Sequence, residues 1–313
     1  MADNLIEVIP AAETTPVNAN LGDDAADDPA IWIHPNDASK STIIGTNKKS
    51  GLGVYALTGE EKFFYPVGRI NNVDVCYGFP LSKETRSDLA GGGNRADLTI
   101  DLFFIDSQTG ALMGPLKPRI SIDTLGMSDA YGFCFYNNPS TNQFFAIVND
   151  KDGHVQQWQI AMENNILKSN LVRHWKMDSQ TEGMVADNEN GHLFIGEENK
   201  GIWRFPACPS KPAEGYFIEN SDTSNKDIEY DIEGLALYIS GEKDGYLIAS
   251  SQGNNSFVIF ERKPNHNYVG TFQIKDDFFD GTEETDGIDV SSFSFGEAFP
   301  SGVFVAQDGY NVD

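Results

Sequence analysis

Acidic and other oxygen-bearing side chains recur along this chain at a regular interval, and they are the residues best placed to do chemistry. Six short motifs begin with polar residues, often include a glycine, and continue into a run of strand-forming residues. Their shared position is occupied by Asp28, Asp74, Tyr131, Glu182, Glu233 and Asp286, at steps of 46, 57, 51, 51 and 53 residues. A period of this length is typical of propellers and solenoids.

If the repeats surround a common axis, the acids at this position converge. Like charges at close range raise the pKa of some members or require a counter-ion, and Ca²⁺ suits clusters of carboxylate and carbonyl oxygens. The alternative is that each acid only caps a turn or accepts hydrogen bonds from loop amides. The acids expected to converge are Asp28, Glu182, Glu233 and Asp286, with Asp27, Asp231, Asp280 and Glu284 beside them.

Basic residues are scarce, at 22 against 47 acids, so their positions are informative. Lys48 and Lys49 follow the second predicted strand, Arg95 follows Gly91–Gly93, and Lys151 occupies a comparable turn. Cations beside metal-loaded carboxylates would suit a phosphorylated ligand. The alternative is that they are solvent-exposed turn residues.

Other common sites are missing from the sequence. There is no P-loop, no GxSxG nucleophile motif and no HExxH or HxH pairing among the five histidines. The three cysteines, Cys76, Cys134 and Cys208, include no CxxC, which excludes a zinc site and a disulfide framework and favours buried thiols.

The net charge of −25 excludes nucleic acid as a partner, because phosphate backbones require a basic surface. The sequence contains no run of about 18 apolar residues, so no membrane span is predicted. The first residues lack the basic start and apolar stretch of a signal peptide.

The elements that must position these residues are short strands. Each motif is followed by β-branched and aromatic runs separated by Gly, Asn, Asp and Ser clusters, which are hairpin signals. Three or four strands in about 50 residues, repeated six times, predict an all-β, six-bladed β-propeller forming one domain over residues 1–313. Residues 1–12 form an N-terminal segment that need be only partly ordered. The sixth repeat is short, so either Leu5–Pro16 closes the ring or the last blade is incomplete.

The chain resembles the β-propeller (alkaline, Bacillus-type) phytases from about Glu13 to Asp313. Nine strings in one order carry this resemblance. They are Asp27-Asp28-Pro29-Ala30-Ile31-Trp32, Thr46-Asn47-Lys48-Lys49-Ser50-Gly51-Leu52, Asn71-Asn72-Val73-Asp74, Ser179-Gln180-Thr181-Glu182-Gly183-Met184, Asp231-Ile232-Glu233-Gly234-Leu235, Ala249-Ser250-Ser251-Gln252-Gly253-Asn254, Asp280-Gly281-Thr282, Thr285-Asp286-Gly287-Ile288-Asp289-Val290 and Phe304-Val305-Ala306-Gln307-Asp308-Gly309.

The resemblance implies a secreted, monomeric, Ca²⁺-dependent phosphomonoesterase of the 3-phytase type, with several structural and catalytic calcium ions. Its implied substrate is phytate, myo-inositol hexakisphosphate as its calcium complex, hydrolysed to lower inositol phosphates and phosphate by a calcium-bound water. Two alternatives stay open: a six-bladed calcium hydrolase of another substrate, such as a lactonase, and a non-catalytic, calcium-stabilised binding propeller.

The resemblance also implies residue roles. Lys48, Glu182, Glu198 and Asp286 are implied to be catalytic, and Lys48, Lys49, Arg95, Tyr131 and Lys151 to bind phosphate. The implied metal ligands are Asp27, Asp28, Pro29, Val73, Glu182, Glu198, Asp231, Glu233, Asp280, Gly281, Glu284, Asp286, Asp308 and Asn311, with Pro29, Val73 and Gly281 acting through their carbonyls. The chain departs from the family at Glu284, where the family has Asp, and at Gly91–Gly93, where it has bulkier residues.

Overall fold

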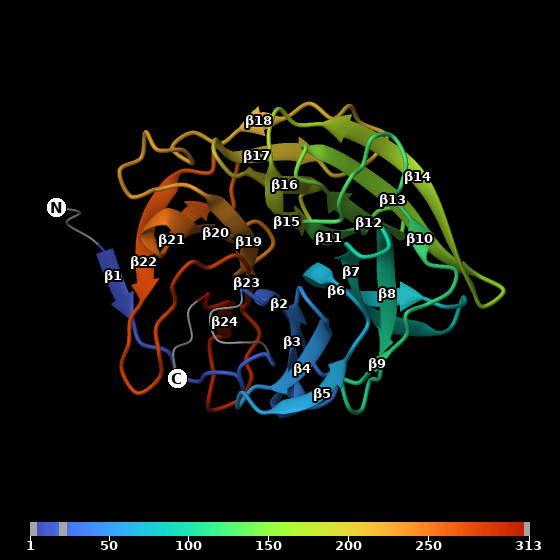
Figure 1. Cartoon of the computed structure of the whole chain (residues 1–313), viewed down its shortest axis with the longest axis horizontal. Helices are drawn as coiled ribbons and strands as arrows, with labels where there is room; N and C mark the ends of the chain where they lie inside the picture. The colour runs from blue at the N-terminus through green and yellow to red at the C-terminus, as the bar shows by residue number, and fades with distance from the viewer. Residues whose placement is uncertain (1–4, 19–23, 310–313) are drawn as a thin grey trace.

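A computed structural model describes residues 5–18 and 24–309. In this part of the chain the secondary structure is almost entirely strand, with two short 3₁₀ turns at Ala38–Lys40 and Gln252–Asn254. The strands form sheets arranged around a central axis, as a β-propeller (Figure 1). The all-β propeller prediction is thus confirmed.

Five blades are complete, each an antiparallel sheet that follows chain order outward from the axis. Blade one comprises β2 (Ala26–Trp32), β3 (Thr42–Asn47), β4 (Gly51–Ala56) and β5 (Glu61–Tyr65). Blade two comprises β6 (Ile70–Pro80), β7 (Arg86–Asn94), β8 (Thr99–Ile105) and β10 (Ile120–Ser121), with β9 (Leu112–Met113) also on β8. Blade three comprises β11 (Phe133–Asn138), β12 (Gln143–Asn149), β13 (His154–Glu163) and β14 (Ile166–Lys176). Blade four comprises β15 (Thr181–Asp187), β16 (His192–Glu197), β17 (Gly201–Pro206) and β18 (Tyr216–Phe217). Blade five comprises β19 (Ile232–Ile239), β20 (Gly245–Ser251), β21 (Ser256–Glu261) and β22 (Tyr268–Ile274).

The sixth repeat forms only a two-stranded sheet, β23 (Ile288–Ser291) with β24 (Val303–Ala306). The prediction of a six-bladed propeller is therefore wrong for the described residues, which form five blades. The inner strand β23 nevertheless packs against β19 of blade five on one side and β2 of blade one on the other, so it joins the two ends of the ring.

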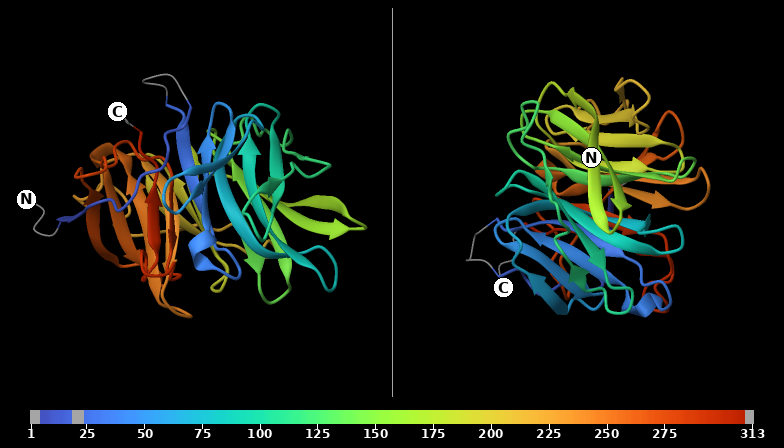
Figure 2. Two further views of the ribbon diagram at one scale, coloured as in Figure 1. Left: turned by 90° about the horizontal axis from the view of Figure 1, so that it is seen from below. Right: turned by 90° about the vertical axis from the view of Figure 1, so that its right-hand side faces the viewer.

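The N-terminal strand β1 (Leu5–Val8) pairs in parallel with β22, with Leu5 opposite Thr271 and Val8 opposite Ile274. It widens blade five, so the expectation that it completes the sixth sheet is wrong. The following segment crosses from blade five towards blade one (Figure 2). It helps to enclose a mainly apolar cavity of about 1200 Å³ beside β24.

Alternating side chains explain why the inner strands are hydrophobic throughout. In β12, Phe144, Ala146 and Val148 pack into a core shared with blade two, whereas Phe145 and Ile147 pack into a core shared with blade four. Successive side chains of a strand point to opposite faces, and each face of a blade is covered by a neighbouring blade. A continuous apolar run is therefore the expected pattern here.

Glycines in the repeated motif allow adjacent blades to approach each other. A Cβ added to Gly132 would lie 1.9 Å from the Glu182 carbonyl oxygen, and one added to Gly183 would lie 2.1 Å from that of Glu233. The contact recurs at Gly234, whose amide donates to the Asp286 carbonyl at 2.7 Å. Around the central axis, the motif of one blade is thus packed on the motif of the next.

Partly buried carboxylates also connect neighbouring blades. Asp28 accepts a hydrogen bond from the Val73 amide at 3.0 Å, Asp74 from Phe135 at 2.7 Å, and Asp289 from Ile31 at 2.7 Å. The last of these bonds spans the junction between the two-stranded sheet and blade one. Burial raises the pKa of Asp74 to about 6 and that of Asp289 to about 7.

Two smaller predictions can also be compared with the structure. Cys76 and Cys134 are buried thiols, as predicted, whereas Cys208 is only partly buried, and all three are free. Within the described residues, the structure contains no helix that is long and apolar enough to cross a membrane.

Candidate active site

Local irregularities of the inner strands place the site residues. The register between the first and second strands shifts between Ala26 and Pro29, between Thr181 and Met184, and between Ile232 and Leu235. Such β-bulges redirect side chains next to active sites. The bulges contain Asp27, Glu182 and Glu233, and a fourth, between Ile70 and Val73, contains Asn71 and Asn72.

This register corrects the interpretation of the second motif. Its position in the ring of bulges belongs to Asn71-Asn72, not to Asp74, which lies farther along β6 and holds Phe135 of blade three.

A second ring of side chains comes from the residue that directly follows the second strand of each sheet. These residues are Lys48, Arg95, Asp150, Glu198, Gln252 and Gln307. Backbone hydrogen bonds hold several of them against the start of the first strand, such as Lys48 N to Ala25 O at 2.8 Å and Glu198 N to Gln180 O at 3.1 Å. The candidate site is built from these two rings.

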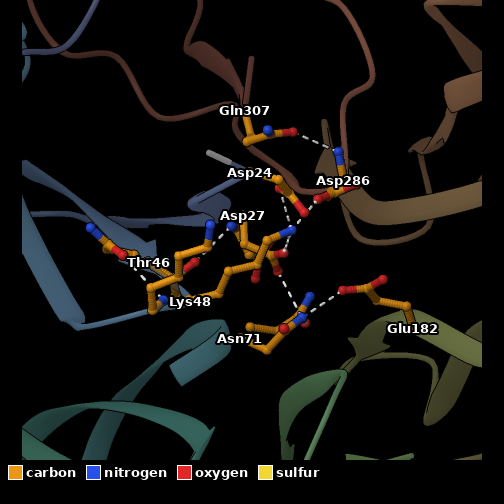
Figure 3. A network of polar contacts seen from close by, with 12 residues as sticks. Asp24, Asp27, Thr46, Lys48, Asn71, Glu182, Asp286 and Gln307 are labelled. Atoms are coloured by element: carbon orange, nitrogen blue, oxygen red, sulfur yellow. Dashed lines mark hydrogen bonds and ion pairs between the residues drawn. The ribbon is translucent and has the colours of Figure 1, made fainter. Parts of the chain in front are cut away.

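Lys48 lies at the centre of an acidic group that we call the lysine cluster, formed with Asp24, Asp27 and Asp286 (Figure 3). Its Nζ is 2.6 Å from Asp24 Oδ1, 2.9 Å from Asp27 Oδ1 and 2.9 Å from Asp286 Oδ2. Burial lowers the pKa of Lys48, but the charges of Asp27 and Asp286 outweigh it and raise that pKa above its ordinary value. Lys48 is therefore a fixed cation.

Asp286 is oriented by two glutamines of the second ring. Gln252 Nε2 donates to Asp286 Oδ1 at 2.6 Å, and Gln307 Oε1 accepts from the Asp286 amide at 2.6 Å. Together with Lys48, these bonds hold a carboxylate whose side chain is 16% exposed.

Three acids form a second group, the glutamate triad of Glu182, Glu198 and Glu233. Each offers a carboxylate oxygen, and these oxygens lie within 4.8 Å of one another. Burial raises the pKa of all three, to about 7 for Glu198 and well above the ordinary value for Glu233, and the neighbouring carboxylates add to both shifts.

Unpartnered carboxylate oxygens in the triad indicate that it fits a calcium ion. Glu198 Oε1 and Glu233 Oε2 are buried, and neither has a hydrogen-bond partner among residues 5–18 and 24–309. An unpaired buried carboxylate oxygen is costly, and three carboxylates in one pocket repel each other unless a cation lies between them. Oxygen donors of this kind are the ligands that calcium prefers.

Cationic and aromatic groups border the triad. Arg95 forms a two-pronged ion pair with Asp129, at 3.0 and 2.7 Å, and lies 5.4 Å from the centre of the Tyr131 ring. Lys151, exposed, has its Nζ 4.2 Å from the same ring centre. Tyr131 hydrogen-bonds to Glu182, while burial and that neighbouring charge raise the pKa of its phenol.

The structure places several other predicted residues outside these clusters. Asp28 hydrogen-bonds to Val73, whereas Pro29 and Val73 pair within their own sheets. Glu284 is exposed, with its amide bonded to Asn255, and Lys49 is an exposed turn residue beside Lys48. Asp231 is close enough to raise the pKa of Glu198. The remaining members, Asp280, Gly281 and Asp308, line the apolar cavity with Asp28 and Pro29, and Asn311 lies outside the described residues.

Sequence reasoning assigned no role to Asn71, Gln252, Gln307, Asp24 or Asp129. The signal that was available for the glutamines is their position, directly after the second strand of their sheet and before glycine or Asp-Gly. Asn71 had the weakest signal, because it is neutral and Asp74 nearby is not.

Comparisons with known proteins agree with this geometry. The chain matches the phytase family profile over residues 1–313. It is 44% identical over 305 residues to the 3-phytase of Bacillus subtilis (strain 168), covering 96% of this chain and 78% of that protein. Two solved structures share the fold: BBS1N in complex with ARL6DN (TM-score 0.52, 10% identity, 89% of this chain and 73% of that one) and a luciferin-regenerating enzyme (TM-score 0.51, 9% identity, 85% and 79%). With the family profile matched from end to end and a 44% identical relative, the chain belongs to the phytase family.

Proposed function

We propose that this protein hydrolyses phytate, releasing inorganic phosphate and lower inositol phosphates, in a calcium-dependent reaction. The observation that carries the proposal is the glutamate triad with two unpartnered carboxylate oxygens, set beside Arg95 and Lys151 in a member of the phytase family. The relative named 3-phytase supports the choice of substrate.

The charge of the substrate explains why a cation is needed. Each phosphate monoester carries roughly two negative charges at neutral pH. A chain with a net charge of −25 would repel such a ligand unless cations lay between them. Bound at the triad, calcium would supply positive charge for the phosphoryl oxygens and would lower the pKa of water.

The chain's own residues would bind and orient the substrate. Glu182, Glu198 and Glu233 would hold calcium, with Asp27 and Asp286 of the lysine cluster as further ligands. Arg95 and Lys151 would donate to phosphate oxygens, and Lys48, which keeps its proton, would act as a cation and not as a base. Asp28, Asp280 and Asp308, beside the apolar cavity, are the residues we propose for peripheral calcium.

We further propose that the β23–β24 sheet occupies the position of a sixth blade. Its support is the packing of β23 between β19 and β2.

We also propose that the protein is secreted and monomeric. Secretion is proposed because weak calcium sites fill only where free calcium is abundant.

Phosphate release from phytate, measured while calcium is titrated, tests the function. We expect turnover that requires calcium and stops when a chelator is in excess, and near-complete loss in Glu182→Ala with the fold retained. Undiminished turnover in excess chelator would contradict the calcium requirement, and no release at any calcium concentration would exclude the function.

A further inference from the structure

Asn71 is the neutral member of a ring that is otherwise mostly acidic. It occupies the bulge of blade two, where other blades place Asp27, Glu182 and Glu233. Its side chain is fully buried. A buried amide is retained only when its hydrogen bonds are satisfied, so its partners indicate what it does.

Three partners of the Asn71 side chain belong to different parts of the site. Nδ2 donates to Asp27 Oδ2 at 2.8 Å and to Glu182 Oε1 at 2.7 Å (Figure 3). Oδ1 accepts from Arg95 at 2.9 Å. Nδ2 also lies 3.0 Å from Oδ1 of the adjacent Asn72. One amide thus connects the lysine cluster, the glutamate triad and the arginine.

The arginine fixes which way the amide points. An asparagine amide has two donor hydrogens and one acceptor oxygen. Because the guanidinium of Arg95 can only donate, it must face Oδ1, and Nδ2 must then face the two carboxylates. Asp129 holds the guanidinium from its other side. The orientation of the Asn71 amide is therefore determined by the hydrogen bonds from Arg95 to Asp129 and to Asn71.

We propose that Asn71 is a positioning residue that couples Arg95 to Asp27 and Glu182. It keeps two carboxylates of adjacent clusters at a set spacing without adding a charge, and it holds Arg95 in the direction of the bound phosphate. The inference rests on the proposed function, since Arg95 is taken as a phosphate contact.

Two substitutions separate these roles. Asn71→Asp keeps an acceptor for Arg95 but removes both donors and adds a charge between the acids. Asn71→Leu removes every side-chain hydrogen bond of Asn71 at similar volume. Gln157→Leu is the matched control, because Gln157 is another fully buried amide, bonded to the Ala207 carbonyl at 2.9 Å in the third strand of blade three.

We expect Asn71→Leu to lower kcat and raise KM for phytate, each by about tenfold, as is common when an outer-shell partner is removed. For Asn71→Asp we expect a similar loss in kcat with KM within about twofold of wild type, because the acceptor for Arg95 is kept. The control should retain both constants. Crystal structures should show Arg95 displaced in Asn71→Leu alone, and Asp27 and Glu182 displaced in both variants.

Unchanged positions of these three side chains in Asn71→Leu, or kinetics that match the control, would overturn the proposal. If Asn71→Leu does not fold, the kcat and the crystal structure of Asn71→Asp decide. If the wild type releases no phosphate, the proposed function fails, and the side-chain positions in the crystal structures still decide whether Asn71 is a positioning residue.

Discussion

At the scale of single residues, the site depends on charged side chains that the fold holds in direct contact. Lys48 contacts three carboxylates within 2.9 Å, and only 14% of its side chain is exposed. Removing a buried partner leaves uncompensated charge, which costs more than the pair itself contributes.

Lys48→Met should therefore reduce kcat/KM for phytate by about 100-fold, the scale seen when one preorganised electrostatic donor is lost. Asp27 and Asp286 would also repel each other and move. Steady-state kinetics with saturating calcium measures this effect, with exposed Lys168→Met as the control. Activity within about threefold of wild type would show that Lys48 lies outside the reacting centre.

The raised pKa of Glu198 makes stability depend on pH in the metal-free protein. Burial is its largest cause, and Glu182 and Asp231 add to it. Between the ordinary value of 4.5 and about 7, the folded state binds more protons at this group than the unfolded state. Stability should therefore fall as pH rises through this window.

Calcium should remove that dependence, because it binds the ionised carboxylates. Melting temperatures measured across the window, with chelator and with calcium, test both statements. Glu198→Gln should reduce the slope of the chelator curve without removing it, because the pKa values of Asp74 and Asp289 are raised into the same window. A melting temperature that rises with pH in chelator would contradict the assigned shift.

The sequence was sufficient to predict most charged members of the site but not its neutral ones. Glu182, Glu233 and Asp286 were predicted from their repeated position, whereas the roles of Glu198 and Lys48 came from the family resemblance. Asn71 was missed because a β-bulge cannot be read from residue types alone. Placing the second motif on Asp74 fitted the repeat spacing equally well, although Asp74 accepts a hydrogen bond from the next blade.

At the scale of elements, two short features build the site: the bulge of the first strand, present in blades one, two, four and five, and the residue after the second strand. The glycines after Glu182 and Glu233 are needed because another blade's backbone occupies the space of their Cβ atoms. The repeating polar–glycine motif was thus a record of blade-to-blade packing as well as of chemistry.

Gly183→Ala should destabilise the protein by about 3 kcal/mol, because its Cβ would lie 2.1 Å from the Glu233 carbonyl oxygen. Gly270→Ala on β22 is the matched control, since an added Cβ there meets nothing within 4 Å. Its effect should stay within about 0.5 kcal/mol. Denaturant unfolding in the presence of calcium compares them, and equal midpoints would contradict the packing argument.

At the scale of the whole molecule, the ring is uneven. Its period predicted the propeller, but not the five complete blades or the parallel pairing of β1 with β22. The choice of an edge strand depends on which sheet presents an unpaired edge nearby, and this is a tertiary property that local patterns do not contain.

The two-stranded sheet should be the first part of the ring to open. Its strands have only four residues each, and most of those residues are only half-buried, whereas most residues of β16 and β20 are buried. Hydrogen exchange in chelator should therefore be faster for amides of β23 and β24 than for β16 or β20. Slower exchange in β24 than in β16 would contradict this order.

The location of that thin sheet matters for how long the protein would keep working. Asp286 comes two residues before β23, and Gln307, which holds its amide, comes directly after β24. Part of the site is therefore attached to the two-stranded β23–β24 sheet, the smallest sheet of the ring. On warming, the enzyme should therefore lose activity before the five complete blades unfold. Activity should disappear while circular dichroism still shows the β-structure of these blades, and rapid cooling should restore the activity.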